Sequence, residues 1–287
     1  MAISKRSLIR SVAVAVSAVT LITASACGSS DNAASTGVTS STEITQQTVK
    51  PGKLTIATGD PAYEPWVMND KPESGNGYEA AVAYAVAKKM GFKKSDVIWT
   101  RTTFDSAIAP GAKDWDMNIQ QFGITEERKK AVDFTSSYYN DSQAVIVKKD
   151  GKYANAKSLS DLKNATIGAM VGTEGYKYAK HIKDDVQTFN DDAAVAQAFN
   201  AGQIDALVTS TVECVYMVQS DEVKDGVVAG RIAGSTSANG MGIVLPKGSK
   251  LTAAATKAVK ELDADGTLKS LQDKWLAEYT TDLKELK

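Results

Sequence analysis

The sequence is poor in the side chains that most often carry metal and acid–base chemistry. Its 287 residues include two cysteines, Cys27 and Cys214, and a single histidine, His181. This composition excludes a zinc cluster and allows one disulfide at most. The G-x-S-x-G, H-E-x-x-H and G-x-x-x-x-G-K-[ST] patterns are also absent. We therefore expect no metal, no cofactor and no catalytic residue, and His181, in a polar segment, is expected to be solvated.

Neither sign of charge dominates the chain. It has 33 Lys and Arg against 34 Asp and Glu, a formal net charge of −1, and no basic block after residue 30. A nucleic-acid partner is therefore not expected, because binding to the phosphate backbone requires clustered cations. The hydrophobic content of 43% and the length are those of an ordinary globular protein with room for two domains.

The first residues have the pattern of a secretory signal peptide. Lys5, Arg6 and Arg10 precede an uncharged run that ends at Ala26. That run is shorter and more polar than the ~20 apolar residues of a membrane-spanning helix. The sequence AlaSerAlaCysGly at 24–28 resembles a lipoprotein cleavage site, although alanine replaces the usual leucine at 24. We predict that residues 1–26 are removed and that Cys27 is lipidated. Cys214 would then remain as a small buried hydrophobe without a disulfide partner.

The rest of the chain divides by composition. Residues 27–52 are rich in Ser, Thr, Asn and Gln, which favours a flexible tether between anchor and body. From Lys53 onward, short β-branched runs alternate with helical periodicity, which predicts an α/β architecture with largely parallel sheets. Two apolar extended passages, Ser142–Lys148 and Ser237–Leu245, are expected to cross between two domains. The loose G-x-G-x-x-A match at 75–80 does not follow a strand, so we interpret it as a turn leading into a helix.

Arg128 is the most informative candidate for binding. Thr125 is a natural helix N-cap, and Arg128 in the following first turn opposes the helix dipole. Positions three or four residues away hold no acid that could form a local ion pair. A guanidinium beside free backbone N–H groups is a good receptor for a carboxylate. The alternative is a surface arginine, or one paired with a remote acid.

A second receptor element is predicted at Gly172-Thr173-Glu174, where a strand ends and a helix begins. An ordinary strand-to-helix turn is the alternative. Tyr63 and Trp66 lie in a proline-bearing loop, and at least one of the two is expected to pack in the core. Phe104 opens a helix, and its ring is expected either to pack or to stack on a ligand.

Several motifs in order carry a family resemblance. The segment 116–139 contains a strand, Thr125-Glu-Glu-Arg128 and then AspPheThrSerSerTyrTyr; Gly77-Tyr-Glu79 precedes a helix, and GlyGlnIleAspAla occupies 202–206. From Lys53 to about Tyr279, the chain resembles the extracellular solute-binding proteins of ABC importers, in the branch that binds polar amino acids. The resemblance implies a periplasmic-binding-protein-like fold with two lobes, two crossover strands and a ligand cleft between them. Lobe 1 would comprise 53–143 and 241–287, and lobe 2 would comprise 144–240.

The resemblance also implies roles for particular residues. Arg128 would grip the α-carboxylate of the ligand, assisted by backbone N–H groups near Gly123 and Thr173. Tyr63 and Phe104 would form aromatic walls, and Asp60 falls where some members recognise a cationic side chain. The protein would be a monomer, anchored to the outer face of the cell membrane through Cys27, that delivers its ligand to ABC permease subunits.

Two positions depart from the family pattern. Ser210 stands where an aspartate usually holds the α-ammonium of the ligand, and Gly123 stands where a hydroxyl is common. Loss of a charged partner for a desolvated ammonium costs several kcal/mol unless another acid compensates. Glu174 or Glu213 could compensate, or the ligand is not a standard α-amino acid. An enzyme on the same fold, of dehydratase or cell-wall lytic type, and a ligand-sensing module remain alternative hypotheses.

Overall fold

The computed structural model describes residues 41–280 and 282–287. The predicted signal peptide and Cys27 lie outside the described residues. Residues 41–52, expected to be part of a free tether, are instead folded, with a helix α1 at Ser41–Gln46. The Val49 amide donates to Asp116 Oδ1 at 2.7 Å, and Ile44 packs against the core. The polar composition was misleading here because one buried carboxylate and one apolar contact order this stretch.

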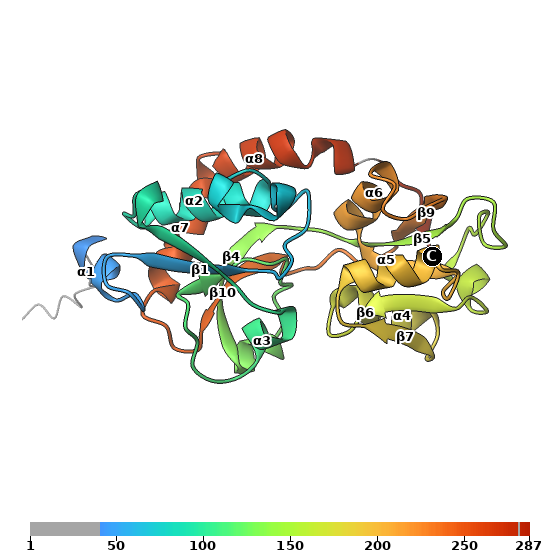
Figure 1. Ribbon diagram of the computed structural model, residues 1–287, viewed down its shortest axis with the longest axis horizontal. Helices are drawn as coiled ribbons and strands as arrows, with labels where there is room; N and C mark the ends of the chain where they lie inside the picture. Colours follow the sequence, from blue (N-terminus) through green and yellow to red (C-terminus); the bar gives the residue numbers. More distant parts are fainter. Residues whose placement is uncertain (1–40, 281) are drawn as a thin grey trace, which may run out of the picture. The chain divides into compact units, whose positions relative to one another are not determined.

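The first sheet is mixed, with strand order β2-β1-β3-β10-β4 (Figure 1). β1 pairs in parallel with β2 and β3, whereas β10 is antiparallel to β3 and β4. Its strands are β1 Leu54–Thr58, β2 Val97–Arg101, β3 Met117–Asn118, β4 Val132–Tyr139 and β10 Met241–Pro246. Every residue of β1 is buried, as expected of a strand covered on both faces. We call this sheet and its helices lobe 1.

The second sheet, with its helices, is lobe 2. Its strand order is β11-β9-β5-β8-β6-β7. β6 pairs in parallel with β7 and β8, while β5 is antiparallel to β8 and β9. Its strands are β5 Gln143–Lys148, β6 Ile167–Met170, β7 Val186–Phe189, β8 Ala206–Ser210, β9 Gly226–Ile232 and β11 Glu285–Leu286.

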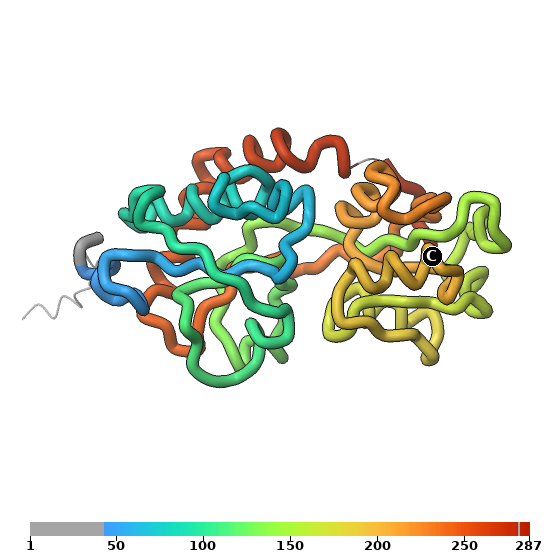
Figure 2. The backbone as a smooth tube through the Cα atoms, in the orientation of Figure 1, coloured from blue at the N-terminus to red at the C-terminus, as the bar shows by residue number. Residues whose placement is uncertain are grey.

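The chain passes between the two sheets at 140–142, between β4 and β5, and at 233–240, between β9 and β10. Figure 2 shows the backbone crossing from one sheet to the other at both passages. β4, β5 and β10 run antiparallel to their neighbours and β9 runs antiparallel to β5, so both sheets are mixed and not largely parallel as expected. β11 pairs with β9. The last strand therefore belongs to lobe 2, and the assignment of the whole segment 241–287 to lobe 1 is incorrect for it; two residues carry too little pattern to reveal a strand.

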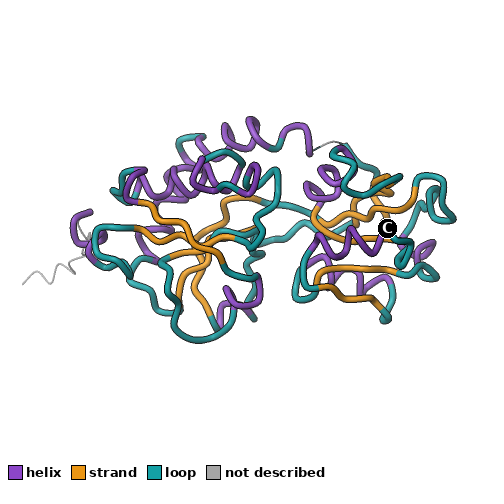
Figure 3. Tube along the Cα trace, in the orientation of Figure 1, coloured by secondary structure: helices purple, strands orange, loops and turns teal. Residues whose placement is uncertain are grey.

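Helices flank both sheets (Figure 3). α2, α7 and α8 pack together and α7 contacts β4, while α4, α5 and α6 contact the strands of lobe 2. The remaining helices after α1 are α2 Tyr78–Lys89, α3 Phe104–Ile108, α4 Glu174–Ile182, α5 Asp192–Asn200, α6 Thr211–Gln219, α7 Thr252–Ala264 and α8 Thr267–Trp275. Short 3-10 turns occupy Met68–Asp70, Pro72–Ser74, Lys94–Asp96, Arg128–Lys130, Leu159–Leu162 and Ala277–Tyr279. None of the helices within 41–280 and 282–287 has the length and apolar content needed to span a bilayer.

Helix α2 follows its sequence pattern closely. Val82, Val86 and Met90 are buried in the lobe 1 core, as their spacing predicts. The helix begins after Gly77, whose positive φ of 101° and close approach to the Trp66 backbone leave no room for a Cβ. The glycine-rich segment is thus the turn into a helix that the sequence predicts. Gly91, with φ of 95°, follows the helix end.

Two single residues also match their predictions. Cys214 is a free, fully buried thiol. His181 is exposed at the end of α4, where its ring meets the edge of Tyr178. Neither side chain lines the cavity described next.

Candidate functional site

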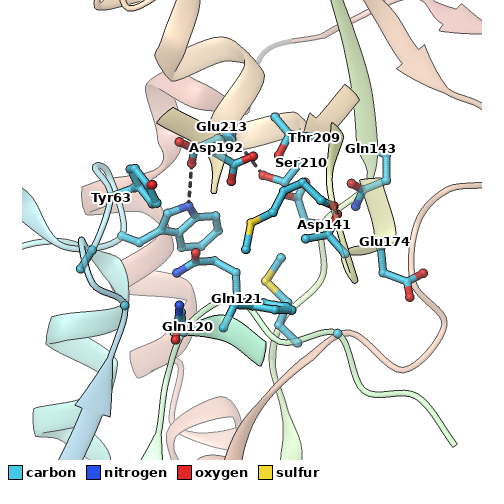
Figure 4. A pocket seen from close by; sticks show the side chains of 18 of the residues that line it. Tyr63, Gln120, Gln121, Asp141, Gln143, Glu174, Asp192, Thr209, Ser210 and Glu213 are labelled. Atoms are coloured by element: carbon cyan, nitrogen blue, oxygen red, sulfur yellow. Dashed lines mark hydrogen bonds between the residues drawn. The ribbon is translucent and has the colours of Figure 1, made fainter. Parts of the chain in front are cut away.

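One cavity is lined by residues of both lobes and of both passages between them (Figure 4). The lining residues include seven of the eight that the sequence predicts as a ligand site: Tyr63, Phe104, Gly123, Arg128, Thr173, Glu174 and Ser210. Asp60 is exposed and is not among the lining residues, although its neighbours Gly59 and Ala62 are. The position of Asp60 gives no support to its predicted role, and the binding roles of the other seven stay predictions.

Arg128 is held by backbone oxygens. Its Nη1 donates to Gly123 O and its Nη2 to Gly172 O, each at 2.8 Å, so it links lobe 1 to lobe 2. The predicted helix after Thr125 is wrong: only a short 3-10 turn, Arg128–Lys130, forms there. Thr125 still acts as a cap, because its Oγ1 accepts from the Arg128 amide at 3.2 Å. The turn is short because the chain enters β4 directly afterwards.

Aromatic rings surround the guanidinium. Its central carbon lies 5.2 Å from the centre of the Phe104 ring and 5.9 Å from that of Phe122. Burial lowers the pKa of Arg128, and the carboxylates of Glu174 and Asp105 act in the opposite direction. An arginine remains charged under any physiological condition, so this part of the cavity carries a poorly hydrated cation.

The turn into α4 completes this end of the cavity. Thr173 caps the helix: its Oγ1 accepts from the Tyr176 amide at 3.1 Å and donates to Met170 O at 2.7 Å. Glu174 pairs with Lys177 at 3.4 Å. A Cβ added to Gly123 would stand 3.4 Å from Glu174 Cγ and 3.5 Å from Arg128 Nη1, so a glycine leaves space between them. We call Gly123, Arg128, Thr173 and Glu174 the arginine end.

Carboxyl groups gather at the other end, around the start of α6. Figure 4 shows Asp192, Thr209, Ser210 and Glu213 together, with Asp141 beside them. Ser210 caps α6, and its Oγ accepts from the Glu213 amide at 3.2 Å. We call Asp141, Asp192, Ser210 and Glu213 the carboxylate end. Of these, the sequence predicts Ser210 and considers Glu213; it misses Asp141 and Asp192.

The carboxyl groups at this end hold protons more tightly than usual. Burial raises the pKa of Asp141 to about 6, although the Ser142 amide and the Ser210 hydroxyl oppose the shift. Burial and the charge of Glu222 raise the pKa of Asp192 to about 6. Burial, then Asp192 and Glu222, raise the pKa of Glu213 well above its ordinary value. Crowded, desolvated acids of this kind favour a cationic partner.

Trp66 and Tyr63 both line the cavity, and Trp66 also packs in the core, as the sequence predicts for at least one of the two. Trp66 is buried in the lobe 1 core, and its Nε1 donates to Glu213 Oε2 at 3.2 Å, a direct contact between the lobes. Tyr63 is half-buried along the cavity wall. Burial and the nearby Asp191 and Asp192 raise the pKa of its hydroxyl, so it stays protonated.

Glu79 positions one wall of the cavity without lining it. Its carboxyl group is fully buried and accepts hydrogen bonds from the Gln121 amide at 2.7 Å, from the Gln121 side chain and from the Tyr138 hydroxyl. Burial raises the pKa of Glu79 to about 7, against these three donors. Gln121 has a positive φ of 49° and lines the cavity just before Gly123. Glu79 therefore fixes the backbone that carries the Gly123 carbonyl to Arg128.

Asp141 and Asp192 are cavity residues that no local sequence pattern predicts. Asp141 lies in the passage between lobes, two residues beyond the Tyr138-Tyr139 pair, and no periodicity marks it as buried. Asp191 and Asp192 match a helix N-terminus, and Asp191 does cap α5 by accepting from the Ala194 amide at 2.7 Å. Helix capping thus explains why an aspartate stands at position 191, but it gives no sign that the neighbouring Asp192 lines the cavity. Within 41–280 and 282–287, no group of His, Cys, Asp and Glu has an arrangement that could hold a metal ion.

A two-lobed α/β fold with such a cavity between its lobes is typical of a solute-binding protein. The chain matches the family model of the bacterial extracellular solute-binding proteins, family 3, over residues 54–278, and it belongs to that family. The predicted family and the predicted periplasmic-binding-protein-like α/β fold are therefore confirmed.

Individual relatives are named as amino-acid-binding proteins. The L-cystine-binding protein TcyJ of Escherichia coli (strain K12) is 29% identical over 223 residues, 76% of this chain and 81% of that protein. The solved structure of an ancestral arginine-binding protein bound to arginine has a TM-score of 0.67 at 31% identity, covering 78% of this chain and 98% of that one. An ancestral amino acid-binding protein, AncCDT-1, a precursor of cyclohexadienyl dehydratase, has a TM-score of 0.65 at 30% identity, covering 78% and 95%.

Proposed function

We propose that this protein captures an amino acid, or an amino-acid-like carboxylate, outside the cell and delivers it to the permease of an ABC importer. Family membership and the amino-acid-binding relatives support the proposal. The observation that carries it is the placement of Arg128. Its guanidinium faces a cavity between two lobes, is flanked by Phe104, and keeps N–H groups beyond the two that bind Gly123 and Gly172. A half-buried guanidinium of this kind suits a carboxylate, which it can bind in a bidentate manner.

The test is a thermal-shift screen of the purified chain against three classes of compound: amino acids, polyamines and small carboxylates. An amino acid that binds should stabilise the folded state by RT ln(1 + [L]/Kd), about 2.7 kcal/mol at a hundredfold excess over Kd. We expect amino acids to shift the melting temperature more than amines or carboxylates alone. A screen in which polyamines alone stabilise the chain would contradict a carboxylate-binding role for Arg128.

The proposal includes anchoring to the outer face of the membrane through a lipid on Cys27. Its support is the sequence pattern at 24–28. Replacement of Cys27 by serine should release the protein into the medium or leave it unprocessed. Detergent-phase partitioning of Cys27→Ser equal to that of the wild type would contradict lipid attachment.

A dehydratase-type enzyme is a second candidate, favoured by one observation. Glu213 is a buried acid in the cavity whose pKa is raised, which is a property of general acids. The distinguishing measurement is mass spectrometry of hydroxylated carboxylic acids incubated with the protein. Loss of water with turnover would establish the enzyme, whereas binding without conversion supports the transport role.

A further inference from the structure

Two buried oxygens at the carboxylate end have no hydrogen-bond partner among the described residues: Asp141 Oδ2 and Glu213 Oε1. Both side chains line the cavity, with only 7% and 4% of their surface exposed. The second oxygen of each is satisfied, since Asp141 Oδ1 accepts from the Ser142 amide at 2.7 Å and Glu213 Oε2 accepts from Trp66 at 3.2 Å. Each carboxyl group therefore has one oxygen with a fixed donor and one oxygen without a direct partner, although the Ser210 hydroxyl and the Thr211 and Val212 amides also favour the charged form of Asp141.

An unpaired buried carboxylate oxygen is costly, so a donor is needed there. The described residues that line the cavity include one cation, Arg128, and it is bound to the Gly123 and Gly172 carbonyls at the arginine end. No lysine is among them. The charges of Asp141 and Glu213 also act on each other, because the Asp141 charge raises the pKa of Glu213. The donor that suits the pair is a cation supplied by the ligand.

We infer that Asp141 and Glu213 together bind the ammonium group of the ligand, in place of an aspartate at position 210. The assignment rests on the proposed function, because it concerns the second charged group of the same amino-acid ligand. An ammonium has three N–H donors, enough to pair both free oxygens at once. Ser210 is retained in a supporting role: it caps α6 and places its hydroxyl next to Asp141.

Glu174 and Asp192, which also line the cavity, are less suited to binding the ammonium group. Glu174 belongs to the arginine end and already pairs with Lys177. Asp192 is half-buried, lies beside the Thr209 side chain and has no unpaired buried oxygen. Of Glu174 and Glu213, the two acids that the sequence offers as compensation for Ser210, the geometry favours Glu213, with Asp141 as its partner.

The test compares amino acids with their deaminated analogues. L-arginine, L-cystine and L-glutamine are titrated calorimetrically into the wild-type chain, together with the matching acids that lack the α-amino group. The same titrations are made with Asp141→Asn, Glu213→Gln and, as the matched control, Asp150→Asn, an exposed aspartate just past the far end of β5. Circular dichroism and thermal melting establish that each variant is folded.

We expect the wild type to prefer at least one amino acid over its deaminated analogue. Asp141→Asn and Glu213→Gln should each weaken amino-acid binding by ~10-fold or more while changing the affinity for the deaminated acid far less. Asp150→Asn should bind as the wild type does. Two variants are used so that poor folding of one leaves the other decisive.

Two results would overturn the inference, and they have different consequences for the proposed function. Folded variants that bind amino acids with wild-type affinity, or that lose affinity equally for both kinds of ligand, would remove Asp141 and Glu213 from the ammonium site but leave the proposed function standing. Absence of binding by these three amino acids and by every amino acid and small carboxylate in the thermal-shift screen would overturn the proposed function together with the inference.

Discussion

The arginine end and the carboxylate end of the cavity stabilise buried charge to different degrees. Arg128 has two backbone carbonyls at 2.8 Å and the faces of two phenylalanine rings around it. Asp141 accepts from the Ser142 amide and lies near the Ser210 hydroxyl and the first amides of α6, and Glu213 accepts from Trp66, yet both carboxyl groups have raised pKa values. The arginine end is thus organised before any ligand arrives, whereas the carboxylate end depends on protons or on a bound cation. Substitution at the arginine end should therefore mainly lower ligand affinity, whereas substitution at the carboxylate end should also change the pH dependence of stability.

The largest effect is expected at the arginine end. Arg128→Ala removes the guanidinium that would pair with a ligand carboxylate, a loss on the order of 2–5 kcal/mol, so affinity should fall by at least ~30-fold. Arg128→Lys should recover only part, because an ammonium keeps the charge but lacks the planar fork. Calorimetric titration with the amino acid found in the screen measures both, and Lys130→Ala, an exposed neighbouring cation, is the control. Near-wild-type affinity of a folded Arg128→Ala variant would contradict the carboxylate clamp.

A smaller effect is expected from Glu79, which supports the arginine end from the lobe 1 core. In Glu79→Gln, a carboxamide offers one acceptor oxygen where the carboxyl group receives three donors. One donor should lose its partner, which lowers the free energy of unfolding by about 1–3 kcal/mol. Urea unfolding measures the change, with Glu73→Gln, an exposed acid ahead of the same helix, as the control. Unchanged stability would show that Gln121 reorients and that Glu79 does not hold it in place.

The smallest effect is a pH dependence that arises at the carboxylate end. The pKa of Asp141 rises from 3.8 to about 6 on folding, so the folded state binds the proton more tightly than the unfolded chain does. Its contribution to stability is complete below about pH 4 and is lost as the pH rises through about 6. Between about pH 5 and about pH 7.5, this corresponds to a loss of about 1–2 kcal/mol.

The ligand-free Asp141→Asn variant should lose less stability than the wild type over that interval. Urea unfolding at the two pH values measures the difference. The groups that face Asp141 are Glu213, Tyr139 and the capped start of α6. Glu213 and Asp192 also have raised pKa values, so the variant should keep a pH dependence of the same sign. An identical pH profile for both proteins would mean that Asp141 is not the titrating group.

A large part of the fold and of the arginine end could be predicted from sequence because local patterns specify them. The helix face of Val82, Val86 and Met90, the glycine turn at 77 and the caps at Thr125 and Thr173 each depend on residues within a few positions. Arg128 stood out because no acid lies within helical reach of it. The same local logic failed for the 3-10 turn after Thr125, since the start of β4 ends the helix after one turn.

The sequence by itself determined the family, the alternation of strands and helices, and the choice of Arg128, in the turn capped by Thr125, as a candidate binding residue. Only the tertiary structure decided that the last strand joins lobe 2 and that residues 41–52 are folded. It also brought Asp141, Asp192 and Glu213 to one place from a passage between lobes and from two helices. These three carboxyl groups come from positions as far apart as 141 and 213, and their shared burial follows from strand pairing and lobe packing. No local pattern of residues encodes that proximity, because it depends on the path of the whole chain.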